Sequence, residues 1–540
     1  MQAWQWTTTL VLAAGLATAA ADAAERSAKA DAAPAVEPVA TGLLAAPQVT
    51  LEQGRLVGLR DAGVQVFKGI PYATPPVGER RWKPPEPAEP WRGRRYAMQF
   101  APDCPQLPYP DQSFFDRGIN PTSEDCLYLN VWTATADPQA RRPVMVWIHG
   151  GALTRGSGAS AWYDGAALAR KGVVLVTINY RLGAFGYLAH PALSQESPHR
   201  ASGNYGLLDQ IAALTWVKNN IGRFGGDPGN VTIFGESAGS WSVHQLTATP
   251  LAAGLFHRAI GQSGAHAYPI PELDRERFGL EPHERTGLAL QDAAGVDSLE
   301  ALRGLSADAL LGAYERANIP GLARPVVDGW VFPEQIVTLY REGRHNRVPL
   351  LLGSNADEGS NLTLGGQPES AEAFEAMMRK RFGTLAEELL RVYDAKRDYL
   401  TAFLASYRDQ SFTWPMRFWA GQAARHDQNV WLYYFAHEPP SPTGFGAYHA
   451  AEIRYVFANP DVDMTATAVD RALAETMSDY WVNFAGTGVP SAPGAPAWPG
   501  YDAERVPYLV FGEEPGVVEG LLEEEMALFD EAAEARWHAR

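Results

Sequence analysis

A serine flanked by two glycines lies where a buried strand gives way to a helix. Residues 235–239 read Gly-Glu-Ser-Ala-Gly, after the apolar run 231–234 and before a segment of helical character at 241–247. On such a sharp turn the serine is held above the sheet, where a base can take its proton. Gly235 and Gly239 carry no side chain, so the strand and the helix can approach closely. The setting predicts that Ser237 is a nucleophile.

A nucleophilic serine needs a base and an acidic group that orients the base. On sheets with this kind of serine turn, the partners follow in the order serine, acid, histidine. Asp357 and Glu358 directly follow a buried apolar run, and His449 lies in a loop after the next such run. The chain has 12 histidines, so spacing alone does not favour His449 over His437 or His244.

Acyl transfer also needs backbone N–H groups aimed at the oxygen on which negative charge develops. One candidate is the amide of Ala238, the residue after the nucleophile. Further candidates lie at residues 149–152, His-Gly-Gly-Ala, directly after the apolar run 144–148. The pattern predicts an oxyanion hole between these two segments.

The elements that must position these groups are short apolar runs separated by helical patterns. The runs suit strands buried on both faces of a mostly parallel sheet. They cover residues 144–148, 173–178, 231–234, 348–352 and 430–435. Residues 206–217 have apolar side chains at helical spacing and end near Gly222. The order strand, helix, loop, strand, serine turn predicts an α/β fold with a doubly wound sheet.

The remaining segments predict additions to this sheet. Residues 55–72 alternate apolar and polar side chains around Asp61-Ala62-Gly63, which predicts an antiparallel hairpin at the sheet edge. Residues 272–344 and 370–408 have mainly helical patterns, which predict helical caps over the site. We expect one domain over residues 47–537.

The first residues resemble a secretory signal peptide. An apolar core at residues 9–16 is followed by Ala21-Asp22-Ala23, a small-x-small cleavage pattern, although the first nine residues contain no Lys or Arg. A short membrane anchor is the alternative, but the run is shorter than the roughly 18 residues that span a bilayer. We expect a signal peptide at 1–23, an Ala/Pro-rich linker at 24–46, and a secreted or periplasmic protein without stable membrane insertion.

Charge and cysteine content narrow the partners. The formal net charge is −17, which argues against nucleic acid as a partner, because phosphate binding needs a basic surface. The only two cysteines, Cys104 and Cys126, are most simply a disulfide in an exported chain, with two free buried thiols as the alternative. Zinc and phosphate-loop motifs are missing from the sequence, so we expect no metal and no organic cofactor.

Several long ordered motifs resemble the type-B carboxylesterase family, which includes the cholinesterases and has the α/β-hydrolase fold. The motifs are residues 69–73 (Gly-Ile-Pro-Tyr-Ala), 123–132 (Ser-Glu-Asp-Cys-Leu-Tyr-Leu-Asn-Val-Trp), 203–210 (Gly-Asn-Tyr-Gly-Leu-Leu-Asp-Gln), 256–264 (Phe-His-Arg-Ala-Ile-Gly-Gln-Ser-Gly) and 498–501 (Trp-Pro-Gly-Tyr). The resemblance implies a large, mostly parallel twisted sheet flanked by helices.

The same resemblance assigns roles to individual residues. It implies Ser237 as nucleophile, Glu358 as acid and His449 as base. It also implies that the oxyanion hole consists of the amides of Gly151, Ala152 and Ala238, and that Cys104 pairs with Cys126. The family usually has a third glycine where this chain has Ala152, but alanine keeps the N–H donor.

Two departures from the family concern the substrate. Cholinesterases carry a tryptophan for choline between the two cysteines, whereas this chain has Phe114 and Phe115 there, which argues against a quaternary ammonium substrate. After the oxyanion segment, Arg155 could bind a substrate carboxylate, or it could form a structural ion pair with Asp164.

The sequence therefore predicts a serine carboxylesterase that hydrolyses a small-molecule ester through an acyl-enzyme intermediate. If Arg155 faces the site, the substrate class extends to tricarballylate esters such as those of fumonisin-like mycotoxins. The alternatives are a lipase acting on long acyl chains and a non-catalytic cholinesterase-like binding protein. The second alternative conflicts with the presence of Ser237, Glu358 and His449.

Overall fold

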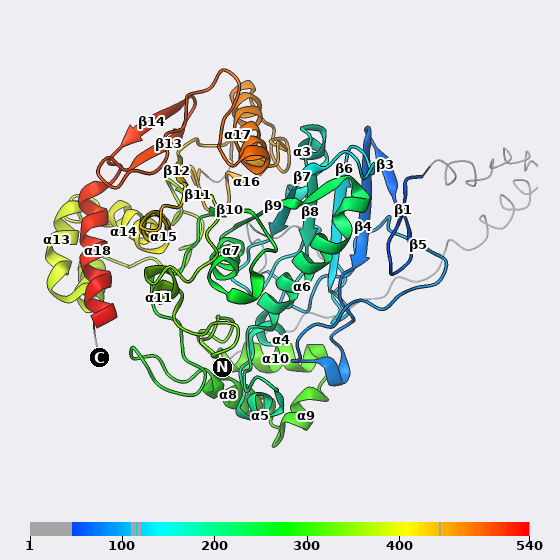
Figure 1. Cartoon of the computed structure of the whole chain (residues 1–540). Helices are drawn as coiled ribbons and strands as arrows, with labels where there is room; N and C mark the ends of the chain where they lie inside the picture. Colours follow the sequence, from blue (N-terminus) through cyan, green and yellow to red (C-terminus); the bar gives the residue numbers. More distant parts are fainter. Residues whose placement is uncertain (1–45, 110–114, 116–119, 442–443, 539–540) are drawn as a thin grey trace, which may run out of the picture. The chain divides into compact units, whose positions relative to one another are not determined.

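The computed structural model describes residues 46–109, 115, 120–441 and 444–538 (Figure 1). The expected signal peptide and nearly all of the expected linker lie outside the described residues, as does Phe114. Residues from Pro47 onward form one compact unit. No helix among the described residues is both long enough and apolar enough to cross a bilayer.

An eleven-stranded sheet organises this unit, in the order β14-β13-β12-β11-β10-β9-β7-β8-β6-β4-β3. Neighbouring strands from β8 to β13 pair in parallel, and the strands at both edges pair antiparallel. The central strands are β7 (Arg142–Ile148), β8 (Val174–Ile178), β9 (Gly226–Glu236), β10 (Arg258–Gln262), β11 (Leu350–Asn355), β12 (Val430–Phe435) and β13 (Pro507–Phe511). All five apolar runs of the sequence form central parallel strands, which confirms the predicted α/β fold.

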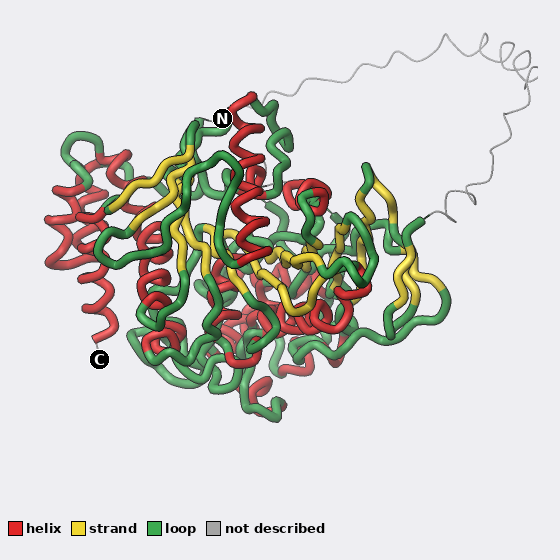
Figure 2. Tube along the Cα trace, turned by 45° about the horizontal axis from the view of Figure 1, so that its top comes forward, coloured by secondary structure: helices red, strands yellow, loops and turns green. Residues whose placement is uncertain are grey.

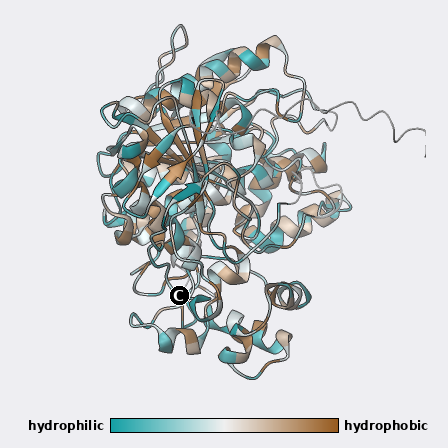
Figure 3. Ribbon diagram, turned by 90° about the vertical axis from the view of Figure 1, so that its right-hand side faces the viewer, coloured by the Kyte–Doolittle hydropathy of each residue, from teal (hydrophilic) through white to brown (hydrophobic). Residues whose placement is uncertain are grey.

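Successive residues of each central strand contribute to different cores, because side chains alternate between the two faces of a sheet. On β7, Val144 and Val146 join one core, and Met145 and Trp147 join the other. Figure 3 shows these strands as a predominantly hydrophobic layer. Burial on both faces explains why the strands appear in the sequence as unbroken apolar runs.

Helices cover both faces of the sheet (Figure 2). On one face, α7 (Ala238–Ala248) contacts β9 and β10, α15 (Trp414–Ala424) contacts β11 and β12, and α6 (Tyr205–Asn220) contacts α7. On the other face, α17 (Ala468–Thr487) contacts β7 and β9, and α3 (Ala166–Arg170) contacts β6 (Tyr128–Thr133) and β8. Helix α6 contains the predicted helix at 206–217.

The predicted edge hairpin is present but shorter than expected. Strands β3 (Leu59–Asp61) and β4 (Val64–Pro71) pair antiparallel across Ala62 and Gly63, whose φ angles are 43° and 84°. Strand β2 (Arg55–Val57) instead joins a small sheet with β1 (Gln48–Thr50) and β5 (Arg94–Tyr96). The chain changes sheets at Gly58, where an added Cβ would lie 2.5 Å from Val66 O.

The two long helical segments contain the helices expected there. Residues 272–344 form α8 (Glu284–Ala294), α9 (Leu299–Arg303), α10 (Ala307–Ala317) and α11 (Ile336–Arg341). Residues 370–408 form α12 (Ala371–Phe382), α13 (Ala386–Val392) and α14 (Tyr399–Arg408). The C-terminal elements are β14 (Pro515–Glu519) and α18 (Glu523–His538).

The contact between the serine turn and β7 generates a prediction about stability. A Cβ added at Gly239 would lie 2.0 Å from Ile148 O, so Gly239→Ala must displace backbone. We expect this substitution to lower the free energy of unfolding by about 3 kcal/mol or more, because the crowded atoms belong to a central strand and cannot move aside. Thermal unfolding followed by circular dichroism measures the effect.

Gly222→Ala is the matched control, because a Cβ there has no atom within 4 Å and its φ is not in the left-handed region. We expect its melting temperature to stay close to that of the wild type. Equal melting temperatures for Gly239→Ala and the wild type would contradict the packing argument.

Candidate active site

The serine turn holds Ser237 in a backbone conformation that non-glycine residues rarely adopt. Ser237 has φ 56° and ψ −122°, between the end of β9 and the start of α7. Its N–H donates to Gln262 O at 2.8 Å, and its carbonyl accepts from Trp241 N at 2.9 Å. Such a residue persists only where its surroundings enforce it. Here the supports are the neighbouring strand β10, which contains Gln262, and the first turn of α7.

Close packing of main chain against main chain surrounds the turn. A Cβ added at Gly235 would lie 2.6 Å from Ile148 O, and one at Gly264 would lie 2.3 Å from Ser237 O. Only glycine fits at these positions without a backbone shift. The spacing of the glycines in the sequence therefore reflects the need to bring β7, β9 and α7 together.

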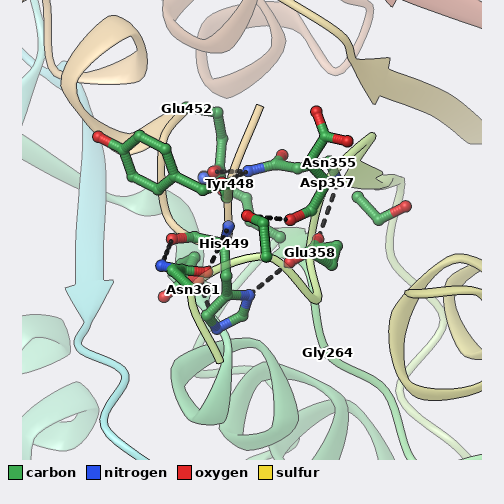
Figure 4. A network of polar contacts seen from close by, with 12 residues as sticks. Gly264, Asn355, Asp357, Glu358, Asn361, Tyr448, His449 and Glu452 are labelled. Atoms are coloured by element: carbon green, nitrogen blue, oxygen red, sulfur yellow. Dashed lines mark hydrogen bonds and ion pairs between the residues drawn. The ribbon is translucent and has the colours of Figure 1, made fainter. Parts of the chain in front are cut away.

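The histidine loop meets the acid at the carboxyl edge of β11 and β12. His449 Nδ1 lies 2.5 Å from Glu358 Oε2 in a buried hydrogen bond. Glu358 is also held by the N–H of Asn355, which donates to its Oε1 at 2.8 Å. The structure thus brings together two of the three predicted catalytic side chains, which are 91 residues apart in the chain. Figure 4 shows this network.

His437 and His244, which spacing could not distinguish from His449, do not contact Glu358. His437 Nε2 lies 2.8 Å from Asp470 Oδ1. His244 stacks on Trp419, with ring centroids 4.1 Å apart. Of these three histidines, only His449 contacts a carboxylate that follows β11. Its Nδ1 is held by Glu358, so Nε2 is the nitrogen left to act as base.

A second carboxylate, which the sequence analysis did not assign to the site, lies at this nitrogen. Glu236 Oε1 is 3.1 Å from His449 Nε2. Glu236 is buried, and its Oε1 has no hydrogen-bond partner among the described residues. Ser237 Oγ likewise makes no hydrogen bond to a described residue. Because Glu236 directly precedes Ser237, the contact places the serine turn beside the histidine loop.

The carboxylates control the charge of the histidine. Burial by itself lowers the pKa of His449, but attraction to Glu236 and Glu358 outweighs it and raises this pKa to about 9. Burial also raises the pKa of Glu236 well above its usual range, although His449 opposes that shift. The attraction exists only while His449 carries its proton and Glu236 does not, so Glu236 and His449 titrate as a pair.

A third buried glutamate lies behind the histidine. Glu452 accepts hydrogen bonds from Asn355 Nδ2 at 2.7 Å and from Gln262 Nε2 at 3.0 Å. Burial raises the pKa of Glu452, and the nearby Glu358 raises it further. The two side-chain amides therefore offset part of the free-energy cost of burying this carboxyl group.

An aromatic ring covers the imidazole. The ring centroid of Phe412 lies 4.8 Å from that of His449. Phe412 belongs to a π-helical segment, Asp409–Thr413, between α14 and α15. Such wide turns occur frequently at functional sites. No sequence signal indicated Phe412, because a π-helical turn has no recognisable periodicity of its own.

The oxyanion segment follows β7 in a left-handed conformation. Gly151, Ala152 and Leu153 have φ angles of 106°, 56° and 61°. The segment is closed by the N–H groups of Thr154 and Arg155, which both donate to Gly151 O. None of the amides of Gly151, Ala152 and Ala238 donates a hydrogen bond to another described residue. Three N–H groups are thus available where the sequence predicted an oxyanion hole.

Arg155 lies beside a loop rather than beside Asp164. Its Nε donates to Leu107 O at 3.1 Å and to Pro108 O at 3.3 Å, and its guanidinium covers the ring of Tyr109. No ion pair between Arg155 and Asp164 is present among the described residues. The terminal nitrogens of Arg155 make no hydrogen bond with a described residue.

The predicted disulfide is present between Cys104 and Cys126.

This fold and these groups define the class of the protein. A parallel sheet, a strained serine between β9 and α7, and a buried histidine–glutamate pair past β11 and β12 are features of an α/β-hydrolase. The chain belongs to the carboxylesterase family, whose model matches residues 45–529. It is a carboxylic ester hydrolase.

The known proteins to which this chain is similar include several esterases. It is 38% identical over 486 residues to a fumonisin B1 esterase from Sphingopyxis macrogoltabida, with 87% of each chain covered. It is also 38% identical to a para-nitrobenzyl esterase from Bacillus subtilis (strain 168), covering 86% of this chain and 95% of that protein. The solved carboxylesterase EST55 of Geobacillus stearothermophilus superposes with a TM-score of 0.79 at 36% identity, covering 89% of this chain and 99% of that one.

The carboxylates around His449 generate a prediction about pH. With His449 as the predicted base, we expect kcat/KM to rise with pH through a midpoint above 6.5, because only the neutral imidazole accepts a proton and its pKa is raised. Glu236→Gln removes one negative charge, so it should lower this midpoint by about one pH unit or more. Rate profiles between pH 5 and pH 10 measure both midpoints.

Glu284→Gln is the control, because this carboxylate is bonded to Ser194 and is not among the groups that shift the pKa of His449. It should leave the midpoint unchanged. A flat profile in the wild type would contradict His449 as the base, and an unchanged midpoint in Glu236→Gln would contradict the coupling.

Proposed function

We propose that this chain is a secreted or periplasmic serine esterase with Ser237 as nucleophile, His449 as base and Glu358 as acid. The observation that carries the proposal is the buried hydrogen bond between His449 Nδ1 and Glu358 Oε2. It fixes the tautomer and orientation that a base needs, as the acid does in other serine hydrolases. The strained conformation of Ser237 supports the same assignment.

The reaction proceeds in two acyl-transfer steps. His449 Nε2 takes the proton of Ser237 as Oγ attacks the ester carbonyl, and the amides of Gly151, Ala152 and Ala238 bind the oxyanion. His449 then protonates the leaving alcohol, and an acyl-enzyme remains. Water deprotonated by His449 releases the acid. Because Nε2 lies beside Glu236 in the structure, the first step requires Nε2 to exchange this neighbour for Ser237 Oγ.

The geometry also favours a particular class of ester. Arg155 lies three residues after Ala152, and its Nε donates to main-chain carbonyls while its terminal nitrogens bind no described residue. A planar guanidinium with free N–H groups binds carboxylates in a bidentate manner. Together with the similarity to a fumonisin B1 esterase, this supports esters whose acid part carries additional carboxylates, such as tricarballylate esters.

Replacing the nucleophile tests the proposed reaction. We expect Ser237→Ala to reduce kcat for p-nitrophenyl butyrate by about 10⁴-fold or more, since no other group forms the acyl-enzyme. Its melting temperature should stay near that of the wild type, because the change removes one hydroxyl group. Substantial turnover by purified Ser237→Ala would overturn the assignment.

Replacing the arginine tests the proposed substrate class. With a tricarballylate ester of a long-chain alcohol, we expect Arg155→Gln to raise KM by about 10-fold to 100-fold, the effect of losing a hydrogen bond between charged groups. The neutral p-nitrophenyl butyrate should be hydrolysed as before. Steady-state kinetics with both esters measure the difference.

Arg170→Gln is the matched control, because Arg170 is an exposed arginine on α3. It should affect neither ester. Equal KM changes for the charged and the neutral ester in Arg155→Gln would return Arg155 to a structural role and leave a generalist carboxylesterase.

A further inference from the structure

The loop that carries His449 has no regular secondary structure to hold it. Residues 445–449 lie between β12 and α16 (Ile453–Val456), outside any helix or strand. Ala450, the residue after His449, has φ 75°, in the left-handed region that alanine rarely adopts. A backbone in this state keeps its conformation only if other groups enforce it. The question is which groups fix the position of His449.

One turn after β11 supplies most of the bonds to this loop. The turn begins at Asn355, the last residue of β11, and runs to Asn361. Figure 4 labels four of its residues, Asn355, Asp357, Glu358 and Asn361, near Tyr448 and His449 of the histidine loop. Its bonds to the loop include Asn355 Nδ2 to Tyr448 O at 2.8 Å, Asp357 N to Ala447 O at 3.0 Å, Ala447 N to Asp357 Oδ2 at 2.8 Å, His449 Nδ1 with Glu358 Oε2 at 2.5 Å, and Ser360 Oγ to Phe445 O at 2.7 Å. The acid is thus one of several contacts between the two segments.

Asn361 is the residue of this turn that bonds the main chain of His449 itself. His449 N donates to Asn361 Oδ1 at 3.2 Å, and Asn361 Nδ2 donates to His449 O at 3.2 Å. Both main-chain groups of the histidine are therefore bonded to one side chain. A carboxamide offers an acceptor and a donor side by side without any change of protonation. Asn361 is 6% exposed, so water does not readily replace these bonds.

We propose that Asn361 is a positioning residue that fixes the main chain of His449 while Glu358, three residues earlier, fixes its ring. The two side chains hold the histidine at two points from the same turn, so the main chain of His449 stays in place while its Nε2 exchanges Glu236 for Ser237. This inference rests on the proposed function, because it assumes that His449 is the base.

The test is Asn361→Ala, assayed with p-nitrophenyl butyrate over a range of pH. A displaced base slows the chemical step without changing the ester pocket, so kcat should fall about 10-fold to 100-fold with KM within about threefold of the wild type. The midpoint of the acidic limb should also move down toward 6.5, because His449 loses its fixed position beside Glu236 and Glu358. A residue that only stabilises the fold would not move this midpoint.

Asn361→Asp is the second variant, since it preserves the shape of the side chain if the alanine variant does not fold. It keeps the acceptor for His449 N and loses the donor to His449 O. We expect its kcat to lie between those of Asn361→Ala and the wild type. Wild-type kcat in Asn361→Asp and in any folded Asn361→Ala would overturn the proposal.

Asn204→Ala is the matched control, because Asn204 makes the same pair of hydrogen bonds to a main chain. Its Nδ2 donates to Val326 O at 2.9 Å, and its Oδ1 accepts from Val326 N at 3.1 Å. This variant should lose thermal stability with unchanged kcat and an unchanged pH profile. If it loses as much activity as Asn361→Ala, the effect is general loosening and the proposal fails. Turnover by Ser237→Ala would instead show that the proposed function itself is wrong, so the two failures are distinguishable.

Discussion

The hydrogen bond between Glu358 and His449 is the interaction on which the rest of the site depends. It joins the turn after β11 to the loop after β12, and these two strands are parallel neighbours in the sheet. Parallel neighbours end at the same edge, where doubly wound sheets bind their ligands. Strand β10 pairs with both β11 and β9, so the serine turn at the end of β9 lies at the same edge. The order of the strands in the sheet therefore brings the segments that carry Ser237, Glu358 and His449 to one edge.

Burying this pair has an electrostatic consequence. Glu236, Glu358 and Glu452 are all buried close to one histidine. Burial raises the pKa of Glu236 and the pKa of Glu452. Amide donors on Asn355 and Gln262 compensate for Glu452, whereas Glu236 Oε1 has only His449 Nε2 beside it. Groups whose protonation is shifted in this way are typical of catalytic centres. The charge of His449 is thus controlled by the carboxylates around it.

Backbone strain is also present at the site. Ala152, Leu153, Ser237 and Ala450 all have φ between 56° and 75°, and each belongs to a segment that carries or flanks a candidate site residue. Such conformations cost on the order of 1–3 kcal/mol each and persist only where neighbouring structure over-determines them. The supports are main-chain contacts around Gly235 and Gly239 for the serine, and the turn at residues 355–361 for the histidine.

The sequence by itself determined the elements: the apolar runs became parallel strands, and the spacing of Gly235, Ser237 and Gly239 marked the serine turn. The motifs shared with the carboxylesterases pointed to Glu358 and His449 as partners. Only the tertiary structure decided which groups act on His449, because Glu236 and Asn361 reach it through the pairing of strands far apart in the chain. Hydrophobic periodicity encodes which face of an element is buried. It does not encode which polar side chains meet where loops from different strands converge.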